Sequence, residues 1–487
     1  MKESRLIVSL ALLAGAAALS CTSFSSGGSS GSGGSGTTTG SGGSTGSGGS
    51  PTGTGGTETT GTGGVGTTGT GGVGTTGTGG VPSTGTGGVA PTGTGGVGTT
   101  GTGGMPTTGT GGRGTAGSGP GTGGTAGSGN PGTGGTVATG ATPCSILAAA
   151  GNACVAAHST VRVIYPNYAG PLYQVCKGAS APGPNSCPGG NTKDIGSVGG
   201  FADAAAQDTF CSGGNCTISI VYDQSPMKND LKPAPAGGAK NSPDNPVVAT
   251  DLPIKLSGHS VYGMYFKHGS TMGYRAGCTA CGVVTPKGTA TGDQPETEYM
   301  VTSQKGLYDG CCFDYGNAET DSHDDGNGTM EAVYFGGGVV WGTGTPGGHN
   351  NGPWVMADLE NGLYAGWANN SDQNIPGNVA LKYDYATAFL IGDTREKNSG
   401  NGRFALYGGD ATTTNLQTLY DGPRPYPPGR SGYIPMKKQG SIILGIGGDN
   451  SDDNGGQFFE GVMASGAASL ATVQAVHANI AAAGYGK

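Results

Sequence analysis

One stretch of the chain decides how the rest is interpreted: Gly352-Pro353-Trp354-Val355-Met356-Ala357-Asp358-Leu359-Glu360-Asn361-Gly362. Side chains alternate between the two faces of a β-strand, so one face of this stretch would be purely apolar while the other would end in Asp358 and Glu360. The dipeptide Asn361-Gly362 tolerates positive φ at both central positions of a type I′ turn, and Leu363-Tyr364 can begin a return strand. The stretch therefore predicts an antiparallel hairpin with two carboxylates at its rim.

The spacing of Asp358 and Glu360 permits two interpretations. Their Cα atoms would lie roughly 7 Å apart on one strand, close enough for each carboxylate to raise the pKa of the other. This arrangement suits general acid/base or nucleophilic chemistry. The alternative is the polar outer face of an ordinary antiparallel strand, which spacing alone favours. The rest of the chain must decide between them.

The composition is biased toward glycine, and the bias is local. The 487 residues include 107 glycines and only 11% charged residues, although the length would suit two or three domains. Residues 143–487 carry 20 basic and 29 acidic side chains. This mildly acidic balance argues against a nucleic-acid partner and favours a neutral ligand.

The first residues have the pattern of an export signal. A basic start and the apolar run Leu6–Leu19, followed by small residues, predict a signal peptide over 1–20 that is too short to span a membrane. Cys21 follows Ala18-Leu19-Ser20, which resembles a bacterial lipoprotein cleavage site. We therefore expect a lipid anchor on Cys21 as the one membrane attachment, with ordinary signal-peptidase cleavage as the alternative. In either case the protein would be exported, as an outer-surface lipoprotein or a secreted protein.

A Gly/Ser/Thr-rich segment over 21–142 follows the signal. Its eight-residue repeat supplies one apolar residue per repeat, which cannot build a core. We expect a disordered tether; a flexible chain of about 120 such residues spans roughly 60 Å. The globular part would then be residues 143–487.

The globular part consists of short β-rich runs separated by Gly, Pro, Asn and Asp clusters. This pattern predicts an all-β fold, an antiparallel β-sandwich with a few short helices, rather than βαβ units. The expected strands are 161–165, 217–222, 247–256, 261–266, 332–335, 339–341, 354–360, 380–383, 386–391, 404–407, 441–446 and 458–463. Two helices are expected, at 201–210 and 470–483, the second from apolar residues at helical spacing.

Ten cysteines remain besides Cys21, and an even number in an exported chain predicts disulfides. The simplest pairing joins sequence neighbours: Cys144–Cys154, Cys176–Cys187, Cys211–Cys216 and Cys278–Cys281. Cys278-Thr-Ala-Cys281 could instead be half of a zinc site, but no second such motif follows. A bond between the adjacent Cys311 and Cys312 would close a rigid ring with a flat apolar surface, whereas pairing of each cysteine elsewhere is the alternative.

Other motifs carry less chemistry. The segment 321–328 resembles a calcium loop, but the nearby Glu331 is one place off the position of the last ligand, so we interpret the segment as a solvated loop. The six histidines form no HExxH motif and residues 143–487 contain no GxSxG motif, which argues against zinc hydrolysis and Ser-His-Asp chemistry. Gly447-Gly448 follows a buried strand with little steric bulk and would place Asp449 where a ligand can approach. By itself Asp449 is more often a turn aspartate.

Six motifs are spread in order across 143–487. They are Pro143-Cys144 to Cys154-Val155-Ala156-Ala157-His158, Ala205-Ala206-Gln207-Asp208-Thr209-Phe210-Cys211, Ile220 to Ser225, Cys311-Cys312-Phe313-Asp314-Tyr315-Gly316-Asn317-Ala318-Glu319, the stretch from Gly352 to Asn361, and Ile443 to Ser451. Together they closely resemble the catalytic domain of α-L-arabinofuranosidase B, glycoside hydrolase family 54. This resemblance overturns the structural interpretations of the carboxylates given above.

The resemblance implies a jelly-roll or concanavalin-like sandwich and a retaining exo-glycosidase that removes terminal α-L-arabinofuranosyl residues from arabinan or arabinoxylan. Matched by motif, Glu360 falls on the nucleophile and Asp449 on the general acid/base, while Cys311-Cys312 falls on a vicinal disulfide that floors the sugar pocket. The positions that match sugar-contacting residues are Trp341, Asp358, Asn361 and Gly448. The resemblance implies no cofactor and no metal ion, and we expect a monomer whose partner is an arabinose-containing plant cell-wall polysaccharide.

A retaining enzyme needs two carboxyl groups roughly 5–5.5 Å apart, here Glu360 ionised and Asp449 protonated. The β-trefoil arabinose-binding module that often follows the family's catalytic domain is not expected, because Lys487 comes shortly after the last predicted helix. Two alternatives remain: a surface-displayed lectin on the same sandwich, and a related glycosidase with shifted sugar specificity.

Overall fold

The computed structural model describes residues 140–278, 286–308, 310–337, 352–366, 377–393, 402–425 and 433–487. The predicted signal peptide, Cys21, nearly all of the predicted tether, the predicted strand 339–341 and Trp341 lie outside these residues. None of the helices in the described ranges is long and apolar enough to cross a membrane.

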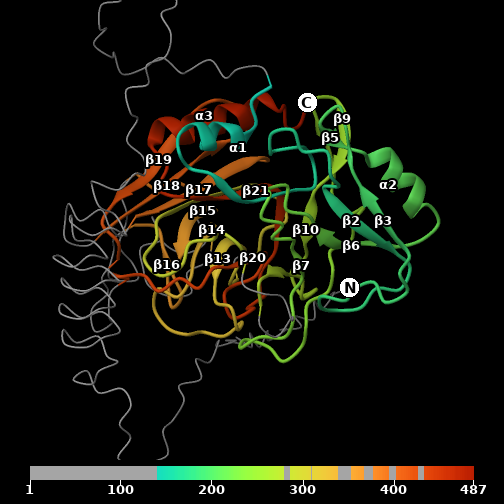
Figure 1. Cartoon of the computed structure of the whole chain (residues 1–487), viewed down its shortest axis with the longest axis horizontal. Helices are drawn as coiled ribbons and strands as arrows, with labels where there is room; N and C mark the ends of the chain where they lie inside the picture. Colours follow the sequence, from blue (N-terminus) through green and yellow to red (C-terminus); the bar gives the residue numbers. More distant parts are fainter. Residues whose placement is uncertain are drawn as a thin grey trace, which may run out of the picture. The chain divides into compact units, whose positions relative to one another are not determined.

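Two antiparallel sheets dominate the described structure (Figure 1). The first, called the β21 sheet, has the order β1 (Cys154–Ser159), β21 (Gly456–Ser465), β12 (Glu296–Thr302), β17 (Ala386–Asp393), β18 (Arg403–Asp410) and β19 (Leu416–Gly422), and β10 (Met264–Phe266) also pairs with β21. The second, called the β20 sheet, has the order β16 (Leu363–Tyr364), β15 (Trp354–Asp358), β14 (Glu331–Gly336), β13 (Asp314–Ala318), β20 (Ser441–Leu444), β11 (Tyr274–Ala276) and β7 (Lys232–Pro233).

The two sheets pack face to face. β12 contacts β13 and β14 across the interface, and β15 contacts β17 and β18. The strands of both inner layers are buried almost throughout, as apolar residues at alternate positions would require. The predicted antiparallel β-sandwich is therefore confirmed.

Smaller elements complete the fold. A three-stranded sheet has the order β3 (Thr192–Ile195), β2 (Tyr173–Lys177) and β6 (Cys216–Val221), and two hairpins join β4 (Ser197–Val198) to β5 (Phe201–Ala202) and β8 (Pro253–Leu256) to β9 (His259–Tyr262). The helices are α1 (Pro143–Ala149), α2 (Ala204–Cys211) and α3 (Leu470–Ala482). In Figure 1, α1 and α3 lie together along the β21 sheet, and the two helices contact each other.

Several predicted elements differ from the structure. Residues 161–165 and 380–383 form no strand, and only the last four residues of 247–256 do so, as β8. Strands β1 to β5, β7, β11 to β13 and β19 were not predicted, nor was α1. The predicted helix 201–210 begins only at Ala204, because Phe201 and Ala202 form β5. Helix α1 does carry a local signal, because Thr142 and Ser145 form a reciprocal capping box around the N-terminal Pro143.

The cysteines pair locally. The structure contains the predicted disulfides Cys144–Cys154, Cys176–Cys187, Cys211–Cys216 and Cys311–Cys312. Cys278 is also disulfide-bonded, so it is not available as a zinc thiolate. Its predicted partner Cys281 lies outside the described residues, and the Cys278–Cys281 bond stays a prediction.

Candidate active site

The predicted hairpin is present, but its turn falls one residue earlier than the sequence indicated. β15 ends at Asp358, and the positive φ angles belong to Glu360 (57°) and Asn361 (59°) rather than to Asn361 and Gly362. The Leu359 amide donates to the Gly362 carbonyl at 3.2 Å, which closes a two-residue turn around Glu360 and Asn361. Glu360 therefore lies at the tip of the hairpin and not on the face of the strand.

Neighbouring groups hold Glu360 in this unusual backbone conformation. A non-glycine residue in the left-handed region costs on the order of 1–3 kcal/mol and persists only where its surroundings fix it. The Glu360 amide donates to Asp358 Oδ1 at 3.1 Å, and the Tyr433 hydroxyl donates to the Glu360 carbonyl at 3.3 Å. Both contacts are to the backbone of Glu360 and help to hold it in this conformation.

The loop after β20 approaches this tip. Gly445 leaves the strand with φ of 74°, and the Gly447 amide donates to the Ser451 carbonyl at 2.9 Å, closing a turn around Asp449. Within the turn, Asp449 Oδ1 accepts the Ser451 amide at 3.0 Å. The predicted exit of the glycine run from a buried strand is therefore observed, and it carries Asp449.

Gly448 is the point at which the loop meets the hairpin. A Cβ atom built on Gly448 would lie 2.7 Å from Glu360 Oε2 and would also clash with Glu319 Oε2. Only glycine leaves room for both carboxyl groups there. The residue next to Asp449 is therefore in close approach to Glu360.

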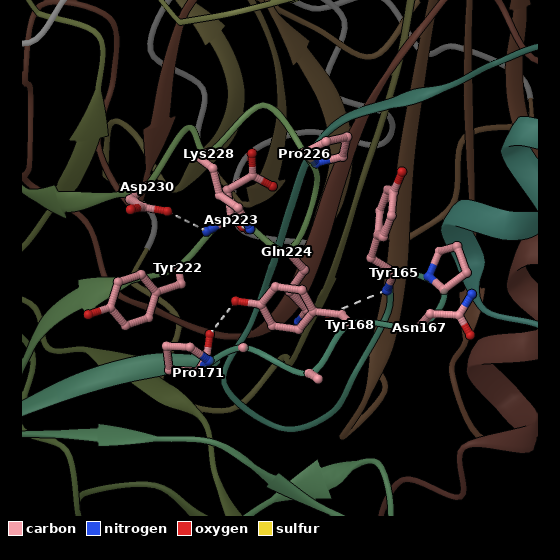
Figure 2. Close-up of a pocket in the computed structure, with 13 residues that line it drawn as sticks. Tyr165, Asn167, Tyr168, Pro171, Tyr222, Asp223, Gln224, Pro226, Lys228 and Asp230 are labelled. Carbon is pink, nitrogen blue, oxygen red and sulfur yellow. Dashed lines mark hydrogen bonds between the residues drawn. The ribbon is translucent and has the colours of Figure 1, made fainter.

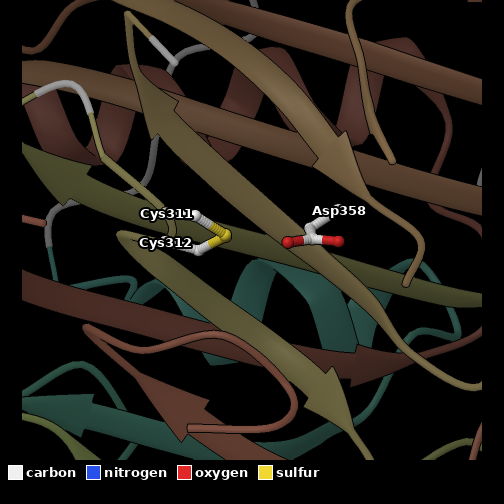
Figure 3. A group of neighbouring side chains, drawn as sticks. All are labelled: Cys311, Cys312 and Asp358. Atoms are coloured by element: carbon white, nitrogen blue, oxygen red, sulfur yellow. A yellow bond between two sulfur atoms is a disulfide. The ribbon is translucent and has the colours of Figure 1, made fainter. Parts of the chain in front are cut away.

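The Cys311–Cys312 disulfide lies beside the same two elements. Figure 3 shows both sulfur atoms on the side of Asp358, and the sulfur and carboxylate atoms of the three residues lie within 4.8 Å of one another. Cys311 Sγ is also 3.7 Å from Ser451 Oγ. Because the two sulfurs are bonded to each other, they are not thiolates and this group lacks the ligand chemistry of a metal site.

The loop predicted to be solvated borders the tip. Asp321, His323, Asp324 and Asp325 are exposed, and Asn361 Nδ2 donates to Asp324 Oδ1 at 3.2 Å. The structure thus brings together Glu360, Asp358, Asn361, Gly448 and the Cys311–Cys312 disulfide, with Asp449 in the adjoining turn.

Two residues that the sequence did not single out complete the site. Glu319, immediately after β13, is fully buried, and its Oε2 lies close to Glu360 Oε2 beside Gly448. Arg275 on β11 donates to the backbone carbonyls of Glu319 and Gly448, and its Nε donates to Asn450 Oδ1 at 3.0 Å. Glu319 was part of a quoted motif, which is the one local signal that could have found it.

The site concentrates carboxyl groups away from water. Burial raises the pKa of Asp358 to about 7 and the pKa of Glu319 to about 7. Burial, together with the charges of Glu319 and Asp358, also raises the pKa of Glu360 well above its usual range. The carboxyl groups of the cluster therefore do not all ionise near neutral pH, and such perturbed pKa values are typical of acid/base sites.

A separate cavity of about 620 Å³ shares no lining residue with this site. Figure 2 shows Tyr165, Tyr168 and Tyr222 around it and Asp223 at its polar side. The Asp223 carboxylate already accepts hydrogen bonds from the amides of residues 157, 225 and 229. Its polar groups therefore hold the local fold, and the candidate active site is the carboxyl cluster.

A β-sandwich with convergent buried carboxyl groups at the end of one sheet is an arrangement expected of glycoside hydrolases. The family model described as "Alpha-L-arabinofuranosidase B, catalytic" matches residues 143–486. The chain belongs to this family.

Known relatives agree with this assignment. The chain is 46% identical over 359 residues to a probable α-L-arabinofuranosidase B of Aspergillus fumigatus, covering 72% of this chain and 64% of that protein. It is 45% identical over 349 residues to an arabinofuranosidase/B-xylosidase of Trichoderma koningii, covering 71% and 63%. A crystal structure of an arabinofuranosidase complexed with arabinofuranosyl-α-1,2-xylobiose superposes with a TM-score of 0.61 at 40% identity, over 71% of this chain and 65% of that one. The chain therefore spans somewhat less than two thirds of these relatives.

Proposed function

We propose that the protein is a retaining, exo-acting α-L-arabinofuranosidase that hydrolyses terminal α-L-arabinofuranosyl residues. The observation that carries the proposal is the close approach at Gly448, where the hairpin tip that bears Glu360 meets the turn that bears Asp449. Family membership over residues 143–486 supports the same activity.

In this mechanism Glu360 attacks the anomeric carbon while Asp449 protonates the departing glycosidic oxygen. The resulting ester between the sugar and Glu360 is then hydrolysed by a water molecule that Asp449, now ionised, deprotonates. Glu360 leaves as a carboxylate and Asp449 regains its proton, so the enzyme returns to its starting state.

The remaining site residues would bind the sugar. The apolar Cys311–Cys312 disulfide would form the floor under the ring, and Asp358, Asn361 and the Gly448 backbone would contact the hydroxyl groups. A role for Trp341 in sugar binding is proposed from the sequence alone, because Trp341 lies outside the described residues. The buried carboxylate of Asp358 can accept a hydrogen bond from a hydroxyl group of the sugar. In a pocket with little water, a sugar that lacks this hydroxyl group would leave the carboxylate without a donor and would bind much more weakly.

Arabinan and arabinoxylan side chains are the proposed substrates. One relative of known structure was solved with arabinofuranosyl-α-1,2-xylobiose, which supports a xylan-linked arabinose as one of them. We further propose that the protein is an exported monomer, attached to the membrane through a lipid on Cys21 or released after cleavage of residues 1–20.

The direct test is hydrolysis of 4-nitrophenyl α-L-arabinofuranoside by the full chain. We expect turnover that is lost in Glu360→Ala and restored in part by azide, a small nucleophile that can occupy the vacated space. Asp449→Ala should lose far more activity on arabinan than on the 4-nitrophenyl substrate, whose leaving group needs little protonation. Asp421→Asn, which changes an exposed carboxylate on β19, is the matched control and should retain parental activity.

A second candidate function differs in the sugar. The Trichoderma koningii relative is named arabinofuranosidase/B-xylosidase, so 4-nitrophenyl β-xyloside belongs in the same assay. If the unmodified protein prefers the xyloside, the proposed specificity for arabinofuranosides is wrong. If the unmodified protein binds arabinose but hydrolyses neither substrate, the protein is a lectin and not an enzyme.

A further inference from the structure

Glu319 is a fully buried acid that the proposed mechanism does not use. It follows β13 directly, and the Thr329 hydroxyl donates to its Oε1. Its backbone carbonyl accepts a hydrogen bond from the Arg275 guanidinium. One carboxyl oxygen and the backbone are therefore both fixed, which leaves Oε2 to point in a defined direction.

That direction is toward Glu360. Both Oε2 atoms lie next to the position that a Cβ atom on Gly448 would take, Glu360 Oε2 at 2.7 Å and Glu319 Oε2 closer still, so the two carboxyl groups lie close together. Within the described part of the chain, no hydroxyl or N–H group donates to Glu319 Oε2. Two buried carboxyl groups this close cannot both ionise without a large cost, so one of them keeps a proton that it can donate to the other.

The charges around the pair do not remove the need for that proton. The charged or titratable groups that face it are Asp358 on β15, Asp324 in the 321–328 loop, Asp449 after β20 and Arg275 on β11. Arg275 is the single cation among them, and its N–H groups donate to the carbonyls of Glu319 and Gly448 and to the Asn450 side chain. The pair therefore carries one proton and one negative charge. Burial and the charge of Glu319 raise the pKa of Glu360, so attack by Glu360 requires a donor that keeps the charge on Glu360.

We propose that Glu319 is the positioning residue for the nucleophile: protonated Glu319 donates a hydrogen bond to ionised Glu360 and keeps the single negative charge of the pair on Glu360. This inference rests on the proposed function, because it assigns Glu319 a role only if Glu360 attacks the sugar. In this proposal Glu319 stays protonated and neutral throughout the catalytic cycle and does not contact the substrate.

The reaction balances with Glu319 unchanged. When Glu360 forms the ester, its negative charge is used in the new bond, and the proton on the departing oxygen comes from Asp449. When water cleaves the ester, Glu360 leaves as a carboxylate and again accepts the hydrogen bond from Glu319. Since hydrogen bonds to the charged form favour that form, Glu319 should assist both the attack and the release of Glu360.

The test compares Glu319→Gln with Glu319→Ala in the full chain, using the pH dependence of kcat/KM on 4-nitrophenyl α-L-arabinofuranoside. The glutamine amide still donates to Glu360, so we expect kcat/KM within about tenfold of the parent and an unchanged acid limb. Alanine removes the donor, so we expect a loss of about 100-fold and an acid limb that moves up by about one pH unit.

A second variant guards against a folding defect. Thr329→Val keeps the side-chain volume but removes the hydroxyl that holds Glu319 Oε1. We expect a loss of a few-fold and a shift of the acid limb in the same direction as in Glu319→Ala, at an unchanged melting temperature.

Two outcomes would overturn the inference while the parent remains active. Acid limbs that stay at the parental position in all three variants would leave Glu319 with a purely structural role. A Glu319→Gln variant as inactive as Glu360→Ala would make Glu319 a proton-transfer catalyst instead of a donor. A parent inactive on arabinofuranosides would refute the proposed function, and the role of Glu319 with it.

Discussion

The sandwich contains two clusters of buried carboxyl groups, and they differ in how their charge is compensated. The site cluster comprises Glu319, Asp358 and Glu360, at the hairpin tip and the end of β13. The inter-sheet cluster comprises Glu296, Glu298 and Glu331 together with Lys438 and Arg424, between the two sheets. Lys438 Nζ lies 2.7 Å from both Glu296 Oε1 and Glu331 Oε2, and Arg424 pairs with Glu331 Oε1.

The pKa of Glu331, which has two cation partners, differs from the pKa values of the other buried acids. Burial raises the pKa of Glu296 to about 7 even beside Lys438, and that of Glu298 well above its usual range. Burial would raise the pKa of Glu331, but Arg424 and Lys438 together lower it to about 2. In the site cluster no ion pair is formed by the described carboxyl groups, and burial raises the pKa of Glu319 and of Asp358 to about 7. The single nearby guanidinium, Arg275, is held by carbonyl groups, and burial lowers its pKa to about 10.

This difference separates a structural role from a chemical one. Glu331 is ionised and paired, so it links two sheets and has no proton to exchange near neutral pH. The carboxyl groups of the site cluster cannot all ionise near neutral pH, and ionising Glu360, as the proposed mechanism requires, costs stability of the kind typically found at functional sites. A buried carboxyl group with a raised pKa therefore does not by itself indicate catalysis, because burial also raises the pKa of Glu298 well above its usual range between the sheets. The site cluster differs in its place, at the hairpin tip next to the turn that bears Asp449.

The largest effect should come from Glu360→Gln. We expect turnover of 4-nitrophenyl α-L-arabinofuranoside to fall by at least about 10⁴-fold, because the amide cannot form the covalent intermediate. The free energy of unfolding at pH 7 should not decrease, since a group that is costly to ionise has been removed. Loss of both activity and stability would contradict the distinction between the clusters.

The inter-sheet cluster should respond in the opposite way to Arg424→Met. Removing one partner of a buried pair costs about 3–5 kcal/mol, so we expect a matching loss in urea unfolding. Activity per folded molecule should stay within about twofold of the parent. Arg403→Met, which breaks the exposed pair with Asp421 on neighbouring strands, is the control and should cost less than about 1 kcal/mol.

The pH dependence of stability should also distinguish the clusters. The pKa of Asp358 is raised to about 7 in the folded protein, above its value near 4 in the unfolded chain. The stability that protonated Asp358 allows is therefore fully present below about pH 4 and is lost as the pH rises through 7. Asp358→Asn should therefore match the parent near pH 4 and become more stable by roughly 1–3 kcal/mol by pH 8. Thermal unfolding across this range measures the difference.

Glu331→Gln should show the reverse trend. The pKa of Glu331 is lowered to about 2 in the folded protein, below its value near 4.5 in the unfolded chain. The contribution of ionised Glu331 to the free energy of unfolding is therefore fully present above about pH 4.5 and is lost as the pH falls through 2. The deficit of the variant should be largest at pH 6 and should shrink as the pH is lowered from 4.5 toward 2. A deficit that is constant over this range would show that the lowered pKa does not contribute to folding.

The smallest effect should come from the Cys311→Ala/Cys312→Ala double variant. The bridge joins adjacent residues, so its removal frees little chain entropy, and we expect a change in melting temperature of only a few degrees. Loss of the apolar floor should raise KM by about tenfold, roughly the burial of one or two methylene groups, with a smaller change in kcat. A change in kcat alone would place the disulfide outside the sugar site.

The sequence was sufficient for the features that local chemistry controls. The hairpin around Asn361 and the glycine exit before Asp449 follow from turn propensities, and the disulfides observed join cysteines close in sequence. The turn was misplaced by one residue because dipeptide preference favours Asn361-Gly362. In the structure, contacts from Asp358 and Tyr433 move the positive φ onto Glu360.

Features that depend on distant partners were not predictable in the same way. The two glutamates of β12 argue against a buried strand when considered alone, and the cation that satisfies Glu296 is Lys438, far along the chain. Glu319 was visible as part of a motif, but its role depends on the hairpin tip that packs against it. Only the three-dimensional structure shows which buried carboxyl group lies next to a lysine or arginine and which lies next to another carboxyl group.

The most direct test of the central claim, that Glu360 is the ionised nucleophile of the site cluster, is to trap the covalent intermediate. The full chain would be incubated with a cyclic sulfate of arabinofuranose configuration, a class of inhibitor already soaked into a related arabinofuranosidase. Peptide mass mapping should find a single adduct on Glu360, present in Asp421→Asn and absent in Glu360→Gln. An adduct on Glu319, Asp358 or Asp449 in the active parent would contradict the account.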